Sequence, residues 1–428
     1  MKLLLLTLFA FAQASVHAED IDSVLKQKLD FFRVYPMESM PVQENRAQIE
    51  LGRRLFMEPA LSGNRNISCM ACHHPMKGMS DGLPLSRTED RKGILKRNSP
   101  AVFNLGRPGH PFMFWDGRVH FEPSTKTFTT PEKNLSKEIT DVMTSALSAQ
   151  ALFPMVSMEE MKGKSGENEI ADAKSNQEAW ERIVQRLKNE KIEGRGKSYS
   201  ELFLQAYPET PVQKINIGHV AEAIGRFESE QFQSTGSPFN QYLKGNTEAL
   251  TLSQKKGLLV FMDRGCIACH QGSELGLNTF FASVGVPQWG AKPMQKDLGR
   301  GDINNETFRK LFFRTPSLLN VGLTAPYMHN GAFATLRDVI NHYSNIKNSI
   351  ETFSVSETTR TSLPVEVEVL NDQGSKSEIF RSVVAPFLRN GLNLSESEKN
   401  HLEAFLKEAL TDPNWVPANS LVERPKNH

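Results

Sequence analysis

All four cysteines of this chain lie in two copies of one pentapeptide, at residues 69–73 and 266–270. Both copies read Cys-x-x-Cys-His, the attachment signature of c-type haem, in which two thiols add to one porphyrin and the histidine ligates its iron. A redox disulfide or half of a zinc site needs only the cysteines, so the histidine in both copies favours haem. The sequence therefore predicts two covalent haems, attached through Cys69, Cys72, Cys266 and Cys269, with His73 and His270 as proximal iron ligands.

Length and charge limit the function classes. The 428 residues are enough for two or three domains, each with its own hydrophobic core. The formal net charge is +1, and such a balanced charge gives no reason to expect a nucleic-acid partner or a membrane surface.

The N-terminus has the pattern of a secretory signal peptide. Lys2 supplies the positive charge, residues 3–12 form a short apolar run, and Ala18 is a small residue before Glu19. The run is too short to cross a bilayer, and no later stretch approaches the required length. The alternative is a buried N-terminal helix. We expect residues 1–18 to be cleaved and the mature chain to be periplasmic, since this type of haem attachment takes place outside the cytoplasm.

The haem motifs are embedded in a weak internal repeat. Residues 52–56 (GRRLF) precede the first motif and residues 257–261 (GLLVF) precede the second, each as an expected helix. Duplication of one haem domain is the simplest explanation. We therefore expect a mainly α fold of two cytochrome c-like domains with long loops, the first over residues 19–236 and the second over residues 237–428.

Three further patterns support the helical class. Residues 220–232 carry apolar side chains at helical spacing, including Val220, Ile224 and Phe227. Capping-box patterns begin at Thr251 and Ser395, each followed by an apolar helical stretch. Alternating strand patterns are scarce.

The second axial position of each iron decides between electron transfer and chemistry. No histidine lies between His74 and His110, so the first haem lacks a nearby distal imidazole. His74 follows His73 too closely to reach the opposite face. For the second iron the sequence offers four candidate ligands, and residue chemistry alone does not choose among Met328, His329, His342 and Tyr343.

Taken together, these motifs resemble the bacterial dihaem cytochrome c peroxidase and MauG family. The resemblance runs from Gly52 to about Tyr343 and more weakly to Leu410. Besides the haem motifs it rests on four short segments, which are jointly specific: residues 97–100 (RNSP), 114–118 (FWDGR), 297–300 (DLGR) and 326–331 (PYMHNG).

The resemblance implies a division of labour between the haems. The N-terminal haem would keep an open face for hydrogen peroxide, and the C-terminal haem would be six-coordinate and store or deliver electrons. The peroxidase branch has a methionine as distal ligand of the second haem, and the MauG branch has a tyrosine. Tyr343 stands at that position, which places the chain on the MauG-like side; the alternative is that Tyr343 only packs in its helix.

The resemblance also supplies a candidate peroxide pocket. Family members have a glutamine, a proline four positions later and a glutamate ten positions after the glutamine, which match Gln150, Pro154 and Glu160. A carboxyl group can take a proton from one peroxide oxygen and return it to the other, so Glu160 is the candidate acid and base. Gln150 would be its hydrogen-bonding companion, and Pro154 would narrow the pocket. Glu159 is the competing carboxylate.

Two further sites follow from the same resemblance. Trp115 matches a tryptophan that lies between the haems and can carry oxidising equivalents, although burial alone would also explain an indole here. A structural calcium would be held by Asn98, Thr324 and Pro326, partly through backbone oxygens that suit Ca²⁺. The alternative is that Asn98 only caps a turn before Pro100. Residues 125–141 look like an inserted loop near the pocket mouth.

The resulting hypothesis is a periplasmic dihaem peroxidase that reduces H₂O₂ at the N-terminal haem and uses the oxidising equivalents, through the second six-coordinate haem, on a protein partner. That partner either donates electrons, as for cytochrome c peroxidases, or has a side chain oxidised, as for MauG. MauG has a surface tryptophan two residues before its second haem motif where this chain has Arg264, so another partner or exit route is expected. The alternative is a dihaem electron-transfer cytochrome without peroxidase activity.

Overall fold

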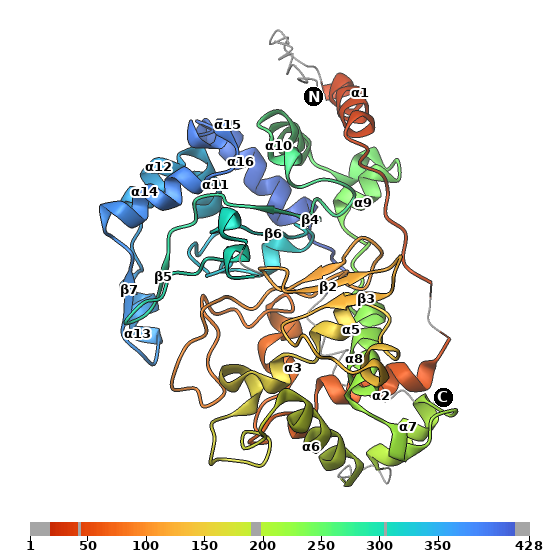
Figure 1. The fold of residues 1–428 in the computed structure, drawn as a ribbon. Coiled ribbons are helices and arrows are strands. Elements are labelled where there is room, and N and C mark those ends of the chain that lie inside the picture. Colours follow the sequence, from red (N-terminus) through yellow and green to blue (C-terminus); the bar gives the residue numbers. More distant parts are fainter. Residues whose placement is uncertain (1–17, 42–43, 190–197, 304–305, 416–428) are drawn as a thin grey trace.

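The computed structural model describes residues 18–41, 44–189, 198–303 and 306–415. Of the expected signal peptide, residues 1–18, all but Ala18 lie outside the described residues. The fold is mainly helical, as predicted, and has two helical halves with short strands between and beside them (Figure 1).

Helices make up most of the regular structure, and the strands are short. The helices are α1 (Ala18–Phe31), α2 (Arg46–Phe56), α3 (Cys69–Cys72), α4 (Lys137–Thr140), α5 (Ala146–Gln150), α6 (Asn176–Asn189), α7 (Tyr199–Ala206), α8 (Ile217–Gln231), α9 (Pro238–Leu243), α10 (Leu252–Asp263), α11 (Leu336–Ser344), α12 (Ile346–Thr352), α13 (Glu357–Ser362), α14 (Gln373–Ser382), α15 (Pro386–Arg389) and α16 (Glu396–Ala404). The strands are β1 (Phe112–Met113), β2 (Val119–Glu122), β3 (Thr127–Thr129), β4 (Leu277–Ala282), β5 (Trp289–Ala291), β6 (Phe313–Thr315) and β7 (Val367–Val369).

Helix α2 packs closely across α8 in the first half. The side chain of Asn45 caps α2 by accepting from the Gln48 amide, and Leu51 and Leu55 on the inner face are fully buried. Burial of each such leucine stabilises the fold by about 1.5–3 kcal/mol. The crossing point is Gly52, where a Cβ atom would collide with the Ala223 carbonyl oxygen and come within 2.8 Å of the Phe227 Cβ.

Helix α10 packs across α16 in the second half in the same way. The capping boxes at Thr251 and Ser395 are both formed, which confirms the two helix starts predicted from the sequence. The crossing point is Gly257, where a Cβ atom would collide with the His401 carbonyl oxygen and come within 2.6 Å of the Phe405 Cβ. The two halves thus share the same helix crossing at a glycine, as a duplication would predict.

The repeat extends into the loops that follow each haem motif. Asn104 and Asn320 both adopt left-handed backbone conformations, with φ of 59° and 60°. The Asn104 amide donates to the Phe232 carbonyl (2.9 Å), and the Asn320 amide donates to the Leu410 carbonyl (2.8 Å). These contacts fix the register between the two halves, with Phe232 equivalent to Leu410.

The two ends of the described chain each cross to the opposite half. Ile21, Leu25 and Leu29 of α1 are buried in the core around α10 and α16, and Figure 1 shows α1 beside the second half. Trp415 packs edge-on against Phe103 in the first core, with ring centroids 4.5 Å apart. A division of the chain at residues 236 and 237 stays a prediction, and these crossings tie the halves together.

A buried ion-pair network joins the halves through three of the short motifs. The Arg97 guanidinium donates to both carboxylate oxygens of Asp297 (2.7 and 2.9 Å) and to Asp116 (2.5 Å). Burial alone would raise the pKa of Asp297, but the Arg97 contacts hold it well below its usual range. Arg300 donates to the backbone carbonyls of Asp116 and Gly117 (3.1 and 3.0 Å), so residues from both halves meet at one point.

Part of the expected insertion at 125–141 is a β-hairpin. Strand β3 pairs antiparallel with β2, with Phe121 opposite Phe128, and β2 pairs with β1. Strands β1 and β2 contact α5, which ends at Gln150, so the hairpin lies over the helix that leads into the candidate peroxide pocket. These strands differ from the inserted loop expected from the sequence.

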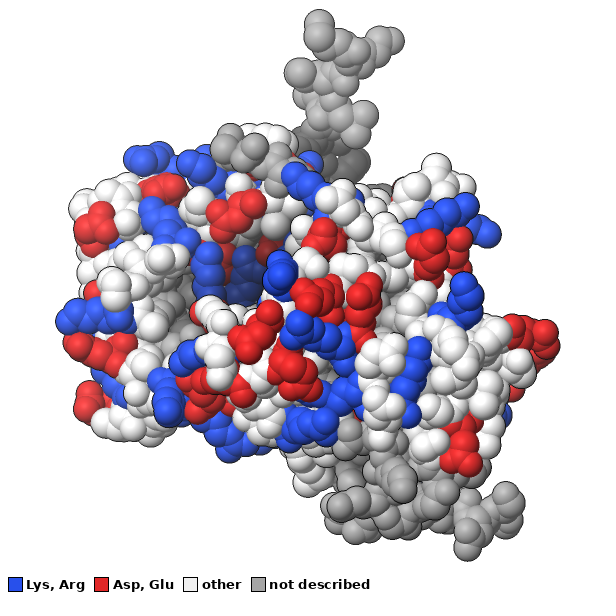
Figure 2. All heavy atoms as spheres, turned by 60° about the horizontal axis from the view of Figure 1, so that its bottom comes forward, with Lys and Arg blue, Asp and Glu red and all other residues white. Residues whose placement is uncertain are grey.

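The surface and the helices agree with the balanced composition. On the face shown in Figure 2, Lys and Arg side chains alternate with Asp and Glu side chains over most of the molecule. In the described part of the chain, no helix is long and apolar enough to cross a membrane.

Candidate haem sites

The first haem site (Cys69, Cys72 and His73) is prepared for a porphyrin. The two cysteines are the first and last residues of the single turn α3 and are both free thiols. The Nδ1 atom of His73 donates to the Met79 carbonyl (3.2 Å), which leaves Nε2 available for iron. Burial lowers the pKa of His73, so the imidazole is held in the neutral form that ligates metals.

The second haem site (Cys266, Cys269 and His270) repeats this arrangement. Its cysteines are free thiols around a short 3₁₀ turn, and His270 Nδ1 donates to the Leu275 carbonyl (3.0 Å). Burial lowers the pKa of His270 to about 4. Both sites thus provide two thiols and one oriented neutral imidazole, which is the donor set a c-type haem needs.

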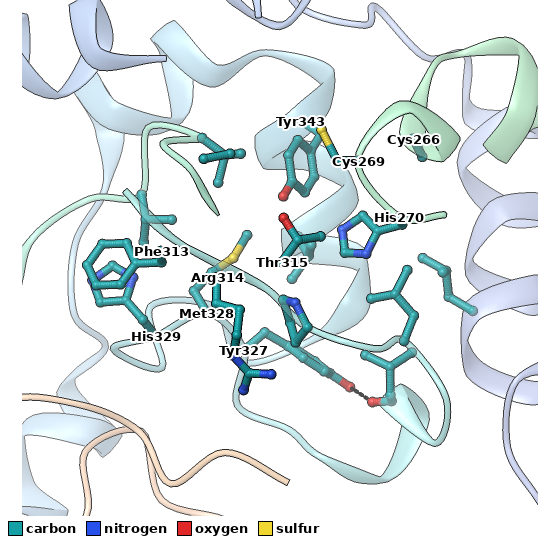
Figure 3. Close-up of a pocket in the computed structure, with 18 of the residues that line it drawn as sticks. Cys266, Cys269, His270, Phe313, Arg314, Thr315, Tyr327, Met328, His329 and Tyr343 are labelled. Atoms are coloured by element: carbon teal, nitrogen blue, oxygen red, sulfur yellow. Dashed lines mark hydrogen bonds between the residues drawn. The ribbon is translucent and has the colours of Figure 1, made fainter. Parts of the chain in front are cut away.

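A largely apolar cavity of about 270 Å³ opens in front of His270. Tyr343, on α11, lines it together with both cysteines of the second site. Figure 3 shows the Tyr343 hydroxyl pointing into the cavity, towards Thr315 and the His270 ring. Burial, and then the neighbouring thiols Cys266 and Cys269, raise the pKa of Tyr343, so the hydroxyl keeps its proton unless a cation binds it.

The other three candidate ligands are placed differently. His342 has both ring nitrogens in hydrogen bonds, to Ser349 Oγ and the Val284 carbonyl (both 2.9 Å). His329 stacks on Phe313 with ring centroids 3.6 Å apart, on the side of the cavity away from His270 (Figure 3). Met328 also lines the cavity. The geometry therefore leaves Tyr343 and Met328 as the candidates that share the cavity with His270.

Carboxyl groups gather at the first haem site. Glu160 lies in the π-helical turn Met158–Lys162 and is half-buried, whereas Glu159 is exposed. Burial, and then the charges of Asp81 and Glu160, raise the pKa of the Cys72 thiol to about 12. Of the two adjacent glutamates, Glu160 is therefore the one whose charge reaches the haem attachment point.

Gln150 and Pro154 lie on the chain segment that leads to Glu160. Gln150 ends α5, whose N-terminus is capped by Ser145, and α5 packs on α8. Pro154 opens the 3₁₀ turn Pro154–Val156, which contacts the turn that holds Glu160. Both residues are half-buried. One continuous segment thus carries all three residues expected in the peroxide pocket.

Trp115 and the three expected calcium ligands line the same cavity as the second haem site. The Trp115 indole N–H donates to the Asn98 carbonyl (2.9 Å), which fixes the ring on the cavity wall. The side-chain N–H of Asn98 donates to the Leu83 carbonyl (2.6 Å). The Asn98 side-chain oxygen is an atom type that Ca²⁺ prefers, and Thr324 and Pro326 line the same cavity.

Sequence reasoning missed two buried ionisable residues near the haem sites. Glu228 on α8 is 6% exposed, and burial raises its pKa to about 8. Arg314 lines the cavity, is 5% exposed, and has a pKa lowered by burial to about 10. The available signal for Glu228 was a carboxylate next to Phe227 on the otherwise apolar face of residues 220–232.

The fold and these sites define a c-type cytochrome with two haem attachment sites. Residues 46–248 match the family model described as di-haem cytochrome c peroxidase. The chain is 31% identical to the cytochrome c551 peroxidase of Pseudomonas aeruginosa over 72% of its own length and 74% of that protein. It is 28% identical to the methylamine utilization protein MauG of Methylorubrum extorquens, over 76% and 78% of the two chains.

Solved structures give the same assignment. A MauG-like protein associated with microbial copper homeostasis superposes with a TM-score of 0.61 at 25% identity, over 92% of this chain and 98% of that one. The dihaem peroxidase BthA from Burkholderia thailandensis shares the fold, with a TM-score of 0.57 at 18% identity over 90% and 93% of the two chains. The chain belongs to the di-haem cytochrome c peroxidase and MauG family and is a haem peroxidase.

Proposed function

We propose that this protein reduces hydrogen peroxide at the first haem site and draws on a second, six-coordinate haem to exchange oxidising equivalents with a protein partner. The proposal rests on the inequality of the two sites. After burial, the charges of Asp81 and Glu160 raise the pKa of the Cys72 thiol. Among the described residues, no carboxylate shifts the pKa of Cys266, Cys269 or His270 in this way. The second site has the Tyr343 hydroxyl instead.

A bound haem at His73 supplies the iron at which the peroxide oxygen–oxygen bond is cleaved reductively. The Glu160 carboxylate accepts a proton from the near oxygen of peroxide and returns it to the far oxygen, so that the leaving group departs as water. Gln150 holds the peroxide by a hydrogen bond, and Pro154 limits the space without offering a ligand atom. His73 keeps its orientation through the Met79 carbonyl.

At the second site, His270 Nε2 and the Tyr343 oxygen would hold the iron of the second haem. An anionic oxygen ligand favours the oxidised states of iron, which suits storage of oxidising equivalents. Trp115, held by the Asn98 carbonyl in the wall of the cavity at the second site, would transfer oxidising equivalents between the haems. A calcium ion held by Asn98, Thr324 and Pro326 would stiffen this same wall.

The partner and the location are part of the proposal. The expected signal peptide and the covalent haem chemistry support a periplasmic enzyme. Arg264, two residues before the second motif, is paired with Glu398 (2.7 Å) on α16 and offers no oxidisable ring. We infer that oxidising equivalents leave by a route other than residue 264. Tyr343 favours oxidation of a partner side chain over simple electron donation.

The direct test compares Glu160→Gln with Glu159→Gln. We expect Glu160→Gln to lower the peroxide-dependent turnover by about 10²–10⁴-fold, the usual contribution of a positioned acid–base group. Glu159→Gln should stay within about twofold of the wild type, because its side chain is exposed. Equal turnover of both variants and the wild type would overturn the assignment of Glu160.

A further inference from the structure

The register between the two halves identifies the counterpart of each residue that faces the second haem. Gly106 in the first half stands where Gly322 stands in the second, and a Cβ atom added there would meet Ser229 and Lys407 respectively. The Ser234 amide donates to the Asn104 side chain (2.8 Å), as the Asp412 amide donates to the Asn320 side chain (2.9 Å). Ser229 and Lys407 are 178 residues apart, as are Ser234 and Asp412, and this is also the separation of Phe232 and Leu410.

By this register, Glu228 of the first half is equivalent to Leu406 of the second. Leu406 lines the cavity of the second haem site together with Leu402. Glu228 should therefore face the first haem from the equivalent wall. The electrostatics agree with this placement, since the charge of Glu228 is the largest cause after burial that raises the pKa of the Cys69 thiol to about 12.

Glu228 is an unusual residue for such a wall. It is 6% exposed, and its Oε2 atom is buried without a hydrogen-bond partner. Burial raises its pKa to about 8, so near neutral pH the carboxyl group is close to its titration point. A buried ionisable group without a partner is costly to the fold, and its presence at a cofactor wall therefore calls for a functional reason.

The charged groups on the neighbouring elements are paired with one another and not with Glu228. On α8 itself, Glu222 binds Arg226, Thr144 and Ser148, and Glu230 binds Arg46 of α2. On α2, Glu50 binds both Arg53 and Arg54. From the loop after the first motif, Arg107 pairs with Glu274 (3.3 Å). Haem attachment converts the Cys69 thiol to a thioether, so Cys69 does not titrate in the holoprotein.

We propose that Glu228 is the proton-exchanging group of the first haem site. Its carboxyl group holds a proton on a side-chain oxygen while the iron is ferrous. When the iron gives one electron to an external acceptor and becomes ferric, the carboxyl group releases one proton to water, and the carboxylate balances the added positive charge. The reverse reaction takes up one electron and one proton. This role depends on haem attachment at Cys69 and not on where peroxide reacts.

The test is the pH dependence of the midpoint potential of the His73 haem in the full-length holoprotein, measured by mediated spectroelectrochemistry from pH 6 to pH 9. In the wild type, each tenfold fall in proton concentration should shift the redox equilibrium by up to tenfold, which is about 59 mV per pH unit. In Glu228→Gln, which keeps the shape of the side chain, and in Glu228→Leu, which copies the second half, this slope should be lost.

Two further variants serve as controls. Glu230→Gln, on the same helix but paired with Arg46, should keep the wild-type slope. The reciprocal variant Leu406→Glu should give the His270 haem a pH-dependent potential. Wild-type slopes in both Glu228→Gln and Glu228→Leu would overturn the proposal, because the remaining slope would then come from other groups such as the haem propionates.

Discussion

Tyr343 and His342 are neighbours on α11, yet their side chains have opposite surroundings. His342 is fixed through both ring nitrogens to Ser349 and Val284, and burial lowers its pKa to about 4. Tyr343 points into the cavity before His270 (Figure 3). Residue type alone would have favoured the histidine as an iron ligand, and hydrogen bonding removes it from the candidates.

Replacement of Tyr343 tests the ligand at the residue scale. We expect Tyr343→Met to raise the potential of the second haem, because a thioether favours ferrous iron more than a phenolate does. The potential and the visible spectrum of the diferric protein report this change. Met328→Leu is the matched control, since Met328 lines the same cavity. A spectrum altered by Met328→Leu and unchanged by Tyr343→Met would assign the ligand to Met328.

At the scale of elements, each haem motif follows a helix that crosses a second helix at a glycine. The crossings of α2 with α8 and of α10 with α16 leave no room for a side chain at Gly52 or Gly257. Close backbone contact at these two points sets the distance between the helix pair, and thereby the position of the wall that faces each haem. The glycines that begin the repeated segments 52–56 and 257–261 are therefore a packing requirement of the haem domain.

Gly52→Ala and Gly257→Ala should each destabilise the holoprotein. Overpacking against a backbone carbonyl costs about 1–3 kcal/mol, measured as the free energy of unfolding in denaturant. Gly374→Ala, at an exposed position in the first turn of α14, is the control and should be neutral or stabilising by up to about 1 kcal/mol. Equal stability of Gly52→Ala and Gly374→Ala would show that the crossing can relax.

The elements also show what the sequence could predict. Capping patterns at Thr251 and Ser395 predicted two helix starts, because a cap is a local hydrogen-bond arrangement. The β2–β3 hairpin and the packing of α1 against the second core were not predicted. Both depend on contacts between segments far apart in the sequence, which periodicity does not record. Glu228 was missed for a related reason, since the register of the two halves appears only in three dimensions.

At the scale of the whole molecule, the halves are joined by the buried Arg97 network. Arg97 is held between Asp116 and Asp297, and although burial opposes it, the two carboxylates raise the pKa of Arg97. The same contacts lower the pKa values of both aspartates. Because Trp115 and Asn98 are the immediate neighbours of Asp116 and Arg97, this network fixes the region between the two haem sites.

Loss of Arg97 should loosen the joint. We expect Arg97→Gln to cost about 3–5 kcal/mol, because two buried carboxylates lose the cation they share and keep only Arg118 beside Asp116 and Lys96 beside Asp297. In the wild type, the aspartate pKa values are depressed on folding. The stabilisation is therefore complete above the unfolded-state pKa of about 3.9 and is lost as the pH falls below it. Denaturant unfolding at pH 7 and pH 3 should show a smaller difference between the two proteins at pH 3. A constant difference would contradict this account.

The central claim is that two copies of one haem motif have become unequal, with an open iron at His73 and an iron closed by Tyr343 at His270. The most direct measurement is the electron paramagnetic resonance spectrum of the resting diferric protein. One high-spin and one low-spin ferric signal of equal intensity are predicted, and Tyr343→Phe should convert or shift only the low-spin signal. Two low-spin signals in the resting protein would contradict the claim, because the His73 iron would then have no open position for peroxide.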